Sequence, residues 1–160
     1  VGLLKNGTKL NLKTIIKMEH LFKEKVNYDT LIGKEQEVYN FAKTASALVD
    51  YGFSCNLITA DKHGADIIAY HIDTGETMSI QLKGSRAVIN KKYKGRNLWI
   101  AYTDRKTNEI CLYDHDLAMS IFENGKSAQT QSWLNNGKYG GMSLHNQFND
   151  IILRLPLNEK

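Results

Sequence analysis

A β-hairpin signal in the middle of the chain constrains the fold more than any other feature. Two segments with strand-like alternation, residues 66–73 and 76–83, are separated only by Thr74-Gly75. A glycine in a short connection between two such segments is typical of a tight turn between antiparallel strands. Because side chains alternate along a strand, Gln81 and Lys83 point to the same side of this hairpin.

The length of the turn decides which residues of the hairpin oppose each other. A two-residue loop places Asp66 opposite Lys83, and Ile68 opposite Gln81. Directly opposed residues of an antiparallel pair have Cβ atoms about 4.5–5.5 Å apart. We therefore expect the hairpin alone to bring an acid, an amide oxygen and an ammonium group onto one patch.

Helices are expected on both sides of the hairpin. Apolar residues at helical spacing predict helices over 12–26 and 31–51, and Gly52 stands where the second would end. After the hairpin, Asp116 is expected to cap a short helix that ends near Gly125.

Further strands and a last helix complete the predicted fold. β-rich segments predict strands over residues 53–57, 97–103 and 109–113. Ser143 is expected to cap a helix that runs to about Leu155 and is ended by Pro156. The order of these elements predicts an α/β (α+β) fold, with a mixed sheet of about five strands flanked by helices.

The composition is that of an ordinary globular domain. The chain has 160 residues, of which 42% are apolar and 24% charged, so we expect one domain over 1–160, with a core over about 31–115 and helical extensions at both ends. The sequence has no membrane-spanning run and no signal-peptide pattern. Cys55 and Cys111 lie in apolar runs, which favours reduced thiols and a cytoplasmic setting, although a single disulfide stays open.

The positive charge is concentrated in one short stretch. The net charge is +4, from 21 basic and 17 acidic residues; without the six basic residues of segment 83–96 it is 15 − 17 = −2. That segment contains no acid and includes an aromatic residue, Tyr93. Such a patch suits a polyanion, most simply a nucleic-acid backbone, and its alternative is a solvated lysine-rich loop.

The predicted patch on the hairpin has the groups needed to hydrolyse a phosphodiester. Asp66, Gln81 and the backbone carbonyl of Leu82 offer the oxygen ligands that Mg²⁺ prefers. A bound ion would neutralise phosphate charge and make a water more acidic, and Lys83 could orient or deprotonate that water. The alternative is a cross-strand ion pair between Asp66 and Lys83 on a solvated face.

Three ordered segments carry a resemblance to a known family. The helix over 31–51 opens with Gly33-Lys34-Glu35-Gln36-Glu37 and is followed by Gly52-Phe53; the hairpin opens with Gly64-Ala65-Asp66-Ile67-Ile68-Ala69 and closes with Gln81-Leu82-Lys83. Over roughly residues 33–103 these segments resemble the G-x-x-x-E helix, the D-[ILV]-[ILV]-A strand and the E-x-K, D-x-K or occasional Q-x-K strand of the PD-(D/E)XK nuclease superfamily. That superfamily includes restriction enzymes, Holliday-junction resolvases and some homing endonucleases.

The resemblance implies a restriction-endonuclease-like fold and specific roles. Asp66 would be the metal-binding acid, Gln81 the second ligand and Lys83 the catalytic lysine. Glu37, on the core helix, would hold a second metal or a coordinated water; helical periodicity leaves Glu35 open as well. Gln81 replaces the usual carboxylate, which removes one negative charge from the metal site.

After the hairpin, the sequence departs from the family pattern. The family core has a helix between its third and fourth strands, but residues 84–96 contain Gly84, Asn90 and Gly95 and are not expected to form a long helix. We interpret this segment as an extended or irregular basic arm. With a later loop it would supply the nucleic-acid contacts, namely Arg86, Lys91, Lys92, Tyr93, Lys94, Arg96 and Lys138.

The predicted activity is that of a metal-dependent DNA endonuclease of restriction, homing or junction-resolving type. The cofactor would be Mg²⁺, with Mn²⁺ as a substitute, and no nucleotide-binding loop is present in the sequence. Because duplex DNA needs two cuts, a homodimer or higher symmetric oligomer is expected. A bacterial, phage or mobile-element origin would fit.

Two alternatives stay open. The first is a catalytically inactive nucleic-acid-binding module of the same fold, which Gln81 suggests. The second is a nuclease toxin with an immunity partner. RNA is the less favoured substrate.

Overall fold

The computed structural model describes residues 21–59, 63–84 and 86–157. Residues 1–32 form a unit separate from the chain that begins at Gly33. In the first unit, η1 (Tyr28–Thr30) is a 3₁₀ turn capped by the side chain of Asn27. Most of the helix predicted over 12–26 lies outside the described residues, and its described end, from Phe22 to Val26, is not helical.

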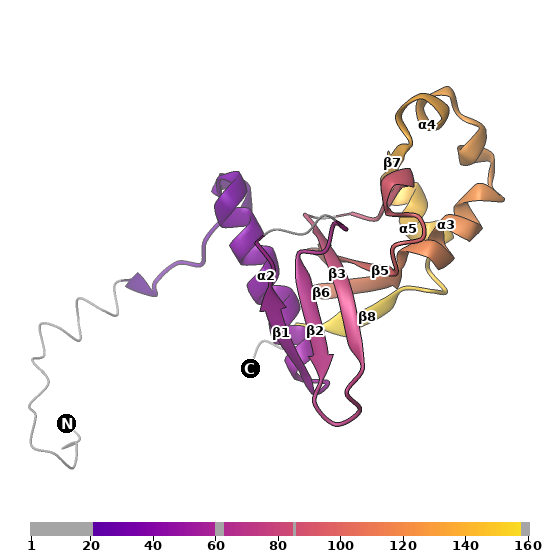
Figure 1. Ribbon diagram of the computed structural model, residues 1–160. Coiled ribbons are helices and arrows are strands. Elements are labelled where there is room, and N and C mark those ends of the chain that lie inside the picture. Colours follow the sequence, from indigo (N-terminus) through magenta and orange to yellow (C-terminus); the bar gives the residue numbers. More distant parts are fainter. Residues whose placement is uncertain (1–20, 60–62, 85, 158–160) are drawn as a thin grey trace, which may run out of the picture. The chain divides into compact units, whose positions relative to one another are not determined.

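The second unit is built on a mixed β-sheet of six strands (Figure 1), which confirms the predicted α/β class with one strand more than expected. The spatial order of the strands is β1-β2-β3-β5-β6-β8, with β3 and β5 parallel and all other neighbours antiparallel. The strands are β1 (Phe53–Leu57), β2 (Ile67–His71), β3 (Thr77–Lys83), β5 (Leu98–Asp104), β6 (Glu109–Asp114) and β8 (Leu153–Pro156). A second sheet pairs β4 (Val88–Asn90) with β7 (Lys138–Gly140).

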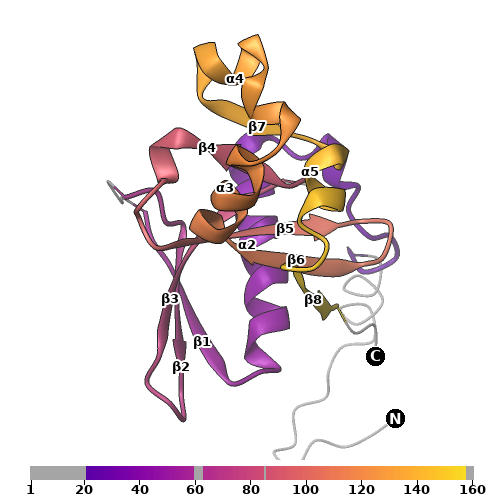
Figure 2. The ribbon, with the colours of Figure 1, turned by 90° about the vertical axis from the view of Figure 1, so that its right-hand side faces the viewer.

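Helices cover both faces of the large sheet. Figure 2 shows α2 (Gly33–Val49) behind the sheet and α3 (His115–Glu123) and α5 (Met142–Gln147) in front of it. The α2 side buries a core that includes Leu48, Ile80 and Leu112, and the other side buries Ile100, Tyr113 and Phe122 among others. Because side chains alternate between the two faces of each strand, the sheet contributes to two cores, as expected for a sheet that is covered on both faces.

Several predicted elements are confirmed. The helix expected over 31–51 is α2, which ends at Val49, two residues before the predicted end, and the N–H of Gly52 donates to the carbonyl of Val49 at 3.0 Å. The strands expected over 53–57, 97–103 and 109–113 are β1, β5 and β6. Both cysteines are free, and Cys111 is fully buried.

The predicted C-terminal helix is wrong. The helix that was expected from Ser143 to Leu155 stops at Gln147 as α5, and the chain then forms β8, in which Arg154 lies opposite Cys111 of β6. β8 has four residues, too few to show an alternating pattern, and its pairing partner lies far away in the sequence. Tertiary pairing therefore decided this segment rather than local propensity.

The predicted cap of α3 is also wrong by two residues. Asp114 caps the helix, since its Oδ1 accepts the N–H of Leu117 at 2.7 Å. Asp116 instead lies inside the first turn, where its carboxylate accepts the N–H of Gly95 at 2.9 Å. α3 is followed by η3 (Lys126–Gln129) and α4 (Gln131–Asn136).

The hairpin of β2 and β3 is confirmed, but its register is not the predicted one. Ile67 pairs with Ile80, and the connection has four residues, because the N–H of His71 donates to Glu76 at 2.8 Å. Ile68 therefore opposes Ser79 rather than Gln81, and this register carried one step further sets Asp66 against Gln81 rather than Lys83. A shift of two residues leaves every side chain on its predicted face, since side chains alternate with a period of two.

The segment after β3 is more ordered than the irregular arm that was predicted. Of residues 84 and 86–96, three form β4 and three form the 3₁₀ turn η2 (Lys91–Tyr93). Ile89 is fully buried, and Tyr93 is only 2% exposed. β4 is held by β7, which lies almost fifty residues later, so no local pattern could have predicted this pairing.

Candidate active site

The candidate site lies where the start of β2 meets the end of β3. Asp66 immediately precedes β2, and its backbone is fixed from both sides: its N–H donates to Ile80 and its carbonyl accepts from Ile58, each at 2.8 Å. Gln81 and Lys83 lie at the C-terminal end of β3. Their side chains are on the opposite face of the strand from those of Ile80 and Leu82. The side chains of Asp66, Gln81 and Lys83 therefore lie on one patch, as predicted, although the register of the hairpin differs from the predicted one.

The Asp66 carboxylate accepts two N–H groups from β3. Its Oδ2 accepts the backbone N–H of Leu82 at 2.7 Å and also the side-chain Nε2–H of Gln81. Burial raises the pKa of Asp66; the Leu82 N–H and the charge of Lys83 oppose the increase, and the charge of Glu37 adds to it. A carboxylate held half-buried beside a second acid gains from a nearby cation.

Gln81 and Lys83 are joined through the hydroxyl of Tyr93. This hydroxyl donates to Gln81 Oε1 at 2.8 Å and accepts from Lys83 Nζ at 3.1 Å. Lys83 Nζ also lies 5.3 Å from the centre of the Tyr93 ring. The four side chains therefore form one chain of hydrogen bonds in the order Asp66, Gln81, Tyr93, Lys83.

Two neighbours hold the ring of Tyr93 in place. The ring of His115, at the start of α3, meets it edge-on with centroids 5.5 Å apart. On another side, a Cβ added to Gly64 would come within 2.9 Å of Tyr93 Cε1. Only a glycine leaves room for the ring at this approach, which gives a physical reason for the glycine that begins the Gly64–Ala69 motif.

Tyr93 has a different place from the one predicted for it. It was expected to contact nucleic acid, but it is buried, with its hydroxyl turned to Gln81 and Lys83. Nothing in the sequence pattern connects Tyr93 with the hairpin. The only available signal was its position as the one aromatic residue in the basic segment.

Glu37 lies near the site without a hydrogen bond to it in the described contacts. Its carboxylate pairs with Lys34 Nζ at 2.5 Å, one turn earlier on α2, and its side chain is about half exposed. Its charge nevertheless raises the pKa of Asp66, whereas Glu35 makes no such contribution. The electrostatic influence on Asp66 thus favours Glu37 over Glu35 as the helix acid associated with the site.

The backbone carbonyl of Leu82, predicted as a third ligand, lies beside the same amide. Gln81 Nε2 is 3.3 Å from this oxygen, while the Leu82 side chain packs into the core under α2. The oxygen atoms expected to surround an ion are therefore gathered around one N–H₂ group. The donor set fits a hard divalent cation if that amide presents its oxygen instead.

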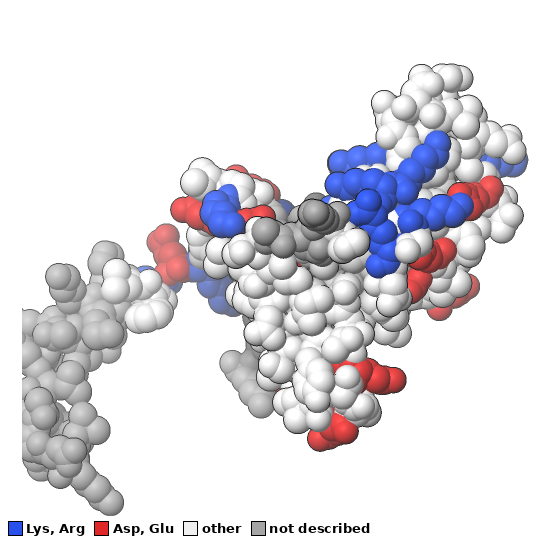
Figure 3. All heavy atoms as spheres, in the orientation of Figure 1, with Lys and Arg blue, Asp and Glu red and all other residues white. Residues whose placement is uncertain are grey.

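The basic residues form a surface next to this site. Lys and Arg side chains gather over β4, η2 and β7 (Figure 3). A pocket of about 510 Å³ is lined by Lys83, Arg86, Lys138 and Tyr139, among others. Pairing of β4 with β7 sets Lys138 opposite Asn90 and so joins it to the predicted basic segment.

The basic surface also continues beyond the predicted residues. Arg86 lines a second pocket, of about 190 Å³, together with Arg105 and Lys106 from the turn between β5 and β6. These two residues were not predicted from the sequence, because only the packing of the chain places that turn near Arg86.

Other predicted nucleic-acid contacts have partners within the protein. Lys91 Nζ lies 4.9 Å from the centre of the Trp133 ring, and Lys92 Nζ lies 4.7 Å from that of Tyr93. Lys94 forms an ion pair with Glu123 at 2.6 Å. All three lysines are exposed, as is Arg96, so each stays at the surface.

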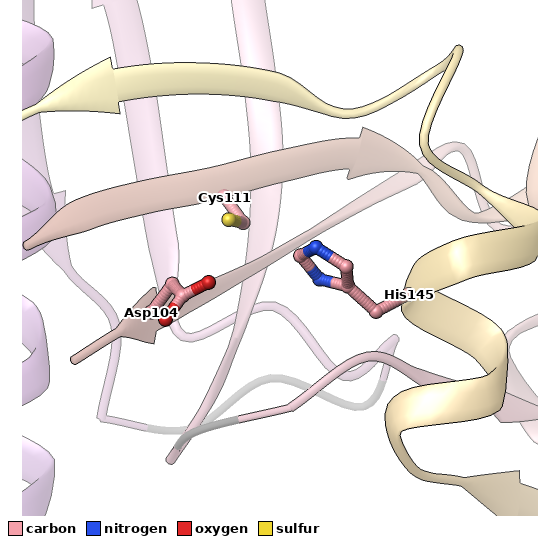
Figure 4. Close-up of side chains that lie close together, drawn as sticks. All are labelled: Asp104, Cys111 and His145. Carbon is pink, nitrogen blue, oxygen red and sulfur yellow. The ribbon is translucent and has the colours of Figure 1, made fainter. Parts of the chain in front are cut away.

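A second cluster of metal-ligand types lies between β5, β6 and α5 (Figure 4). Ligand atoms of Asp104, Cys111 and His145 lie within 4.8 Å of one another. However, both ring nitrogens of His145 have partners: Tyr102 Oη lies 2.5 Å from Nδ1 and Arg154 lies 3.1 Å from Nε2. The positive charge of the Arg154 guanidinium disfavours a metal cation next to it. Burial also raises the pKa of the Cys111 thiol, which disfavours the thiolate that a metal would need. We therefore interpret the cluster as a hydrogen-bonded contact between α5 and the sheet.

Among the described residues, no helix is both long and apolar enough to cross a membrane.

Comparisons with other proteins do not add to this geometry. No protein-family description, curated protein or solved structure matches the chain.

Proposed function

We propose that this protein is a metal-dependent endonuclease that hydrolyses phosphodiester bonds in DNA. The observation that carries the proposal is the convergence of Asp66, Gln81 and Lys83 at the end of one hairpin, with Lys83 also lining a basic pocket. Carboxylate, amide oxygen and ammonium together can bind a divalent cation and a phosphate on neighbouring positions.

Each residue of the site has a distinct part in this proposal. Asp66 and Gln81 would hold Mg²⁺, or Mn²⁺ in its place. When bound, the ion would offset the charge of the scissile phosphate and make a nearby water more acidic. Lys83, held by Tyr93 between the site and the basic pocket, would orient that water and stabilise negative charge on the phosphate.

The basic surface supports a nucleic-acid backbone as the substrate. Arg86 and Lys138 line the same pocket of about 510 Å³ as Lys83, and Arg105 and Lys106 extend the surface. Because each chain would carry one site, cleavage of both strands of a duplex requires two copies, and we propose a homodimer for that reaction. Restriction, homing and junction resolution are all compatible with this arrangement.

One observation favours a second candidate function, a nucleic-acid-binding module without catalysis. The Gln81 amide directs its N–H₂ group at the Asp66 carboxylate, so the acid already has a neutral partner. A site fixed in this arrangement would not bind a cation, but the basic surface would still bind a polyanion.

A cleavage assay with matched variants tests the proposal. Supercoiled plasmid, a four-way junction and RNA are incubated with the full chain and Mg²⁺ or Mn²⁺, with a chelator as the metal-free control. Asp66→Ala and Lys83→Ala should each lower the cleavage rate by about 10²-fold or more. Asp73→Ala, at the exposed tip of the same hairpin, and Lys126→Ala, at the exposed first residue of η3, should cleave like the wild type.

Binding measurements separate the two candidate functions. Arg86→Glu and Lys138→Glu should weaken DNA binding and reduce its salt dependence, whereas Lys126→Glu should not. Salt-dependent binding without cleavage of any substrate would favour the binding module. Cleavage that Lys83→Ala does not slow would contradict the proposed mechanism.

A further inference from the structure

We propose that the side-chain amide of Gln81 has two orientations, and that a divalent cation at Asp66 selects the second. In the first, the N–H₂ group faces Asp66 and the oxygen faces Tyr93, as in this structure. In the second, the amide is turned over, so that the oxygen faces the cation and the N–H₂ group faces Tyr93. This inference rests on the proposed function, because it concerns how the same site receives its metal.

The first orientation leaves no oxygen of Gln81 for an ion. Oε1 is taken by the Tyr93 hydroxyl at 2.8 Å, and Nε2–H donates to Asp66. A cation beside Asp66 would lie against the positive end of the amide dipole, which is repulsive. Binding through Asp66 and Gln81 together therefore requires the amide to turn.

Turning the amide changes its chemistry but hardly its shape. The terminal torsion of a glutamine is broad and roughly two-fold, and oxygen and N–H₂ are nearly equal in size. Gln81 is 9% exposed, so rotation in place is easier than movement of the side chain out of the fold. The space that holds one orientation thus also holds the other.

Tyr93 can serve both orientations. A phenol hydroxyl donates one hydrogen bond and accepts others, so it can donate to the Gln81 oxygen or accept from the Gln81 N–H₂ group. In either case it keeps a lone pair for Lys83, whose Nζ lies 3.1 Å away. The amide end that faces Tyr93 thus has a partner in both orientations, but in the second the Tyr93 O–H loses the Gln81 oxygen as its acceptor, and binding of the cation has to offset that loss.

The two orientations explain how a glutamine can replace a carboxylate here. Without a cation, a second carboxylate would repel Asp66, whose pKa is already raised by burial and by Glu37. The amide neutralises that position with its N–H₂ group and offers an oxygen only when a cation is present. With Gln81 at this position, the Asp66 carboxylate therefore has a hydrogen-bond donor even when no metal is bound.

Proton NMR on the wild-type chain labelled with ¹⁵N tests the switch directly. In the metal-free protein, the Gln81 N–H₂ protons should show a nuclear Overhauser effect (NOE) to the Leu82 amide proton, because both groups donate to the same Asp66 oxygen. With saturating Mg²⁺ that NOE should be lost and one to the Tyr93 ring protons should appear. The Gln81 signals are identified by their absence in Gln81→Glu.

Two controls belong to this experiment. The exposed side-chain amide of Gln131, which bonds to Asn135 on α4, should keep its NOEs in Mg²⁺. In Asp66→Asn, Mg²⁺ should leave the Gln81 NOEs unchanged, because the carboxylate that attracts the cation is gone.

The outcomes separate this inference from the proposed function. Exchange of the NOE partner on binding of Mg²⁺ supports the inference. If Mg²⁺ shifts the Leu82 amide signal while the Gln81 N–H₂ group keeps its NOE to Leu82, the inference is overturned and the metal site stands. If no signal near Asp66 responds to Mg²⁺ or Mn²⁺, both are overturned.

Discussion

Substitution of Gly64 by alanine tests the packing that holds the site together. Gly64 has φ +93°, which side-chain-bearing residues rarely adopt, and an added Cβ would lie 2.9 Å from Tyr93 Cε1 and 3.4 Å from Cδ1. The Tyr93 ring must therefore move, and its hydroxyl would lose the bonds to Gln81 and Lys83. The prediction is a loss of stability together with a loss of cleavage.

The magnitude follows from two contributions. The positive φ alone should cost about 1–2 kcal/mol for alanine. The two hydroxyl bonds contribute about 0.5–1.5 kcal/mol each, and more if a buried partner is left unsatisfied. Gly64→Ala should thus lower the free energy of unfolding by about 2–5 kcal/mol, or about 2–4 °C in Tm for each kcal/mol in a chain of this size.

Gly95→Ala is the matched control. Gly95 also has a positive φ, of +72°, but an added Cβ meets nothing within 4 Å. In urea unfolding followed by circular dichroism, Gly95→Ala should show only the backbone cost, about 1–2 kcal/mol. Equal destabilisation by the two variants would show that contact with Tyr93 does not matter and would refute the reasoning.

Three further predictions concern the fold around the site. Asp114→Ala should lower the free energy of unfolding by about 1 kcal/mol in urea melts, because it removes the cap on the N–H of Leu117. Phe122→Ala should lower it by about 3–5 kcal/mol in the same assay, since Phe122 is fully buried on the inner face of α3; a smaller loss than Asp114→Ala would contradict the packing. Burial lowers the pKa of His115 below 6.5, so the unfolded chain binds the proton more tightly and stability should fall as pH falls from 6.5 towards the lower folded value. His115→Gln should remove that part of the pH dependence, and an unchanged pH profile would show that His115 is not the titrating group.

The local part of the fold could be predicted from sequence. α2, β1, β5 and β6 have strong apolar patterns, and the Thr74-Gly75 turn sets β2 beside β3. The convergence of Asp66, Gln81 and Lys83 depended only on alternation within this hairpin. It was therefore robust to a register error of two residues.

The long-range part could not be predicted in the same way. Parallel pairing of β3 with β5, and pairing of β4 with β7, join segments whose own sequences do not specify a partner. Long-range pairing with β6 likewise makes residues 153–156 a strand, where a helix was expected. Tyr93 of η2 reaches Gln81 of β3 through a hydrogen bond across twelve residues of sequence, and no local pattern predicts that contact.

The most direct test of the central claim is the ratio of plasmid cleavage rates for the wild type and Lys83→Ala, measured in Mg²⁺ at equal protein concentration. The wild-type rate should be about 10²–10⁴-fold higher, and cleavage should be lost completely when the metal is chelated. Equal rates for the two proteins, or cleavage that persists without a divalent cation, would contradict the account.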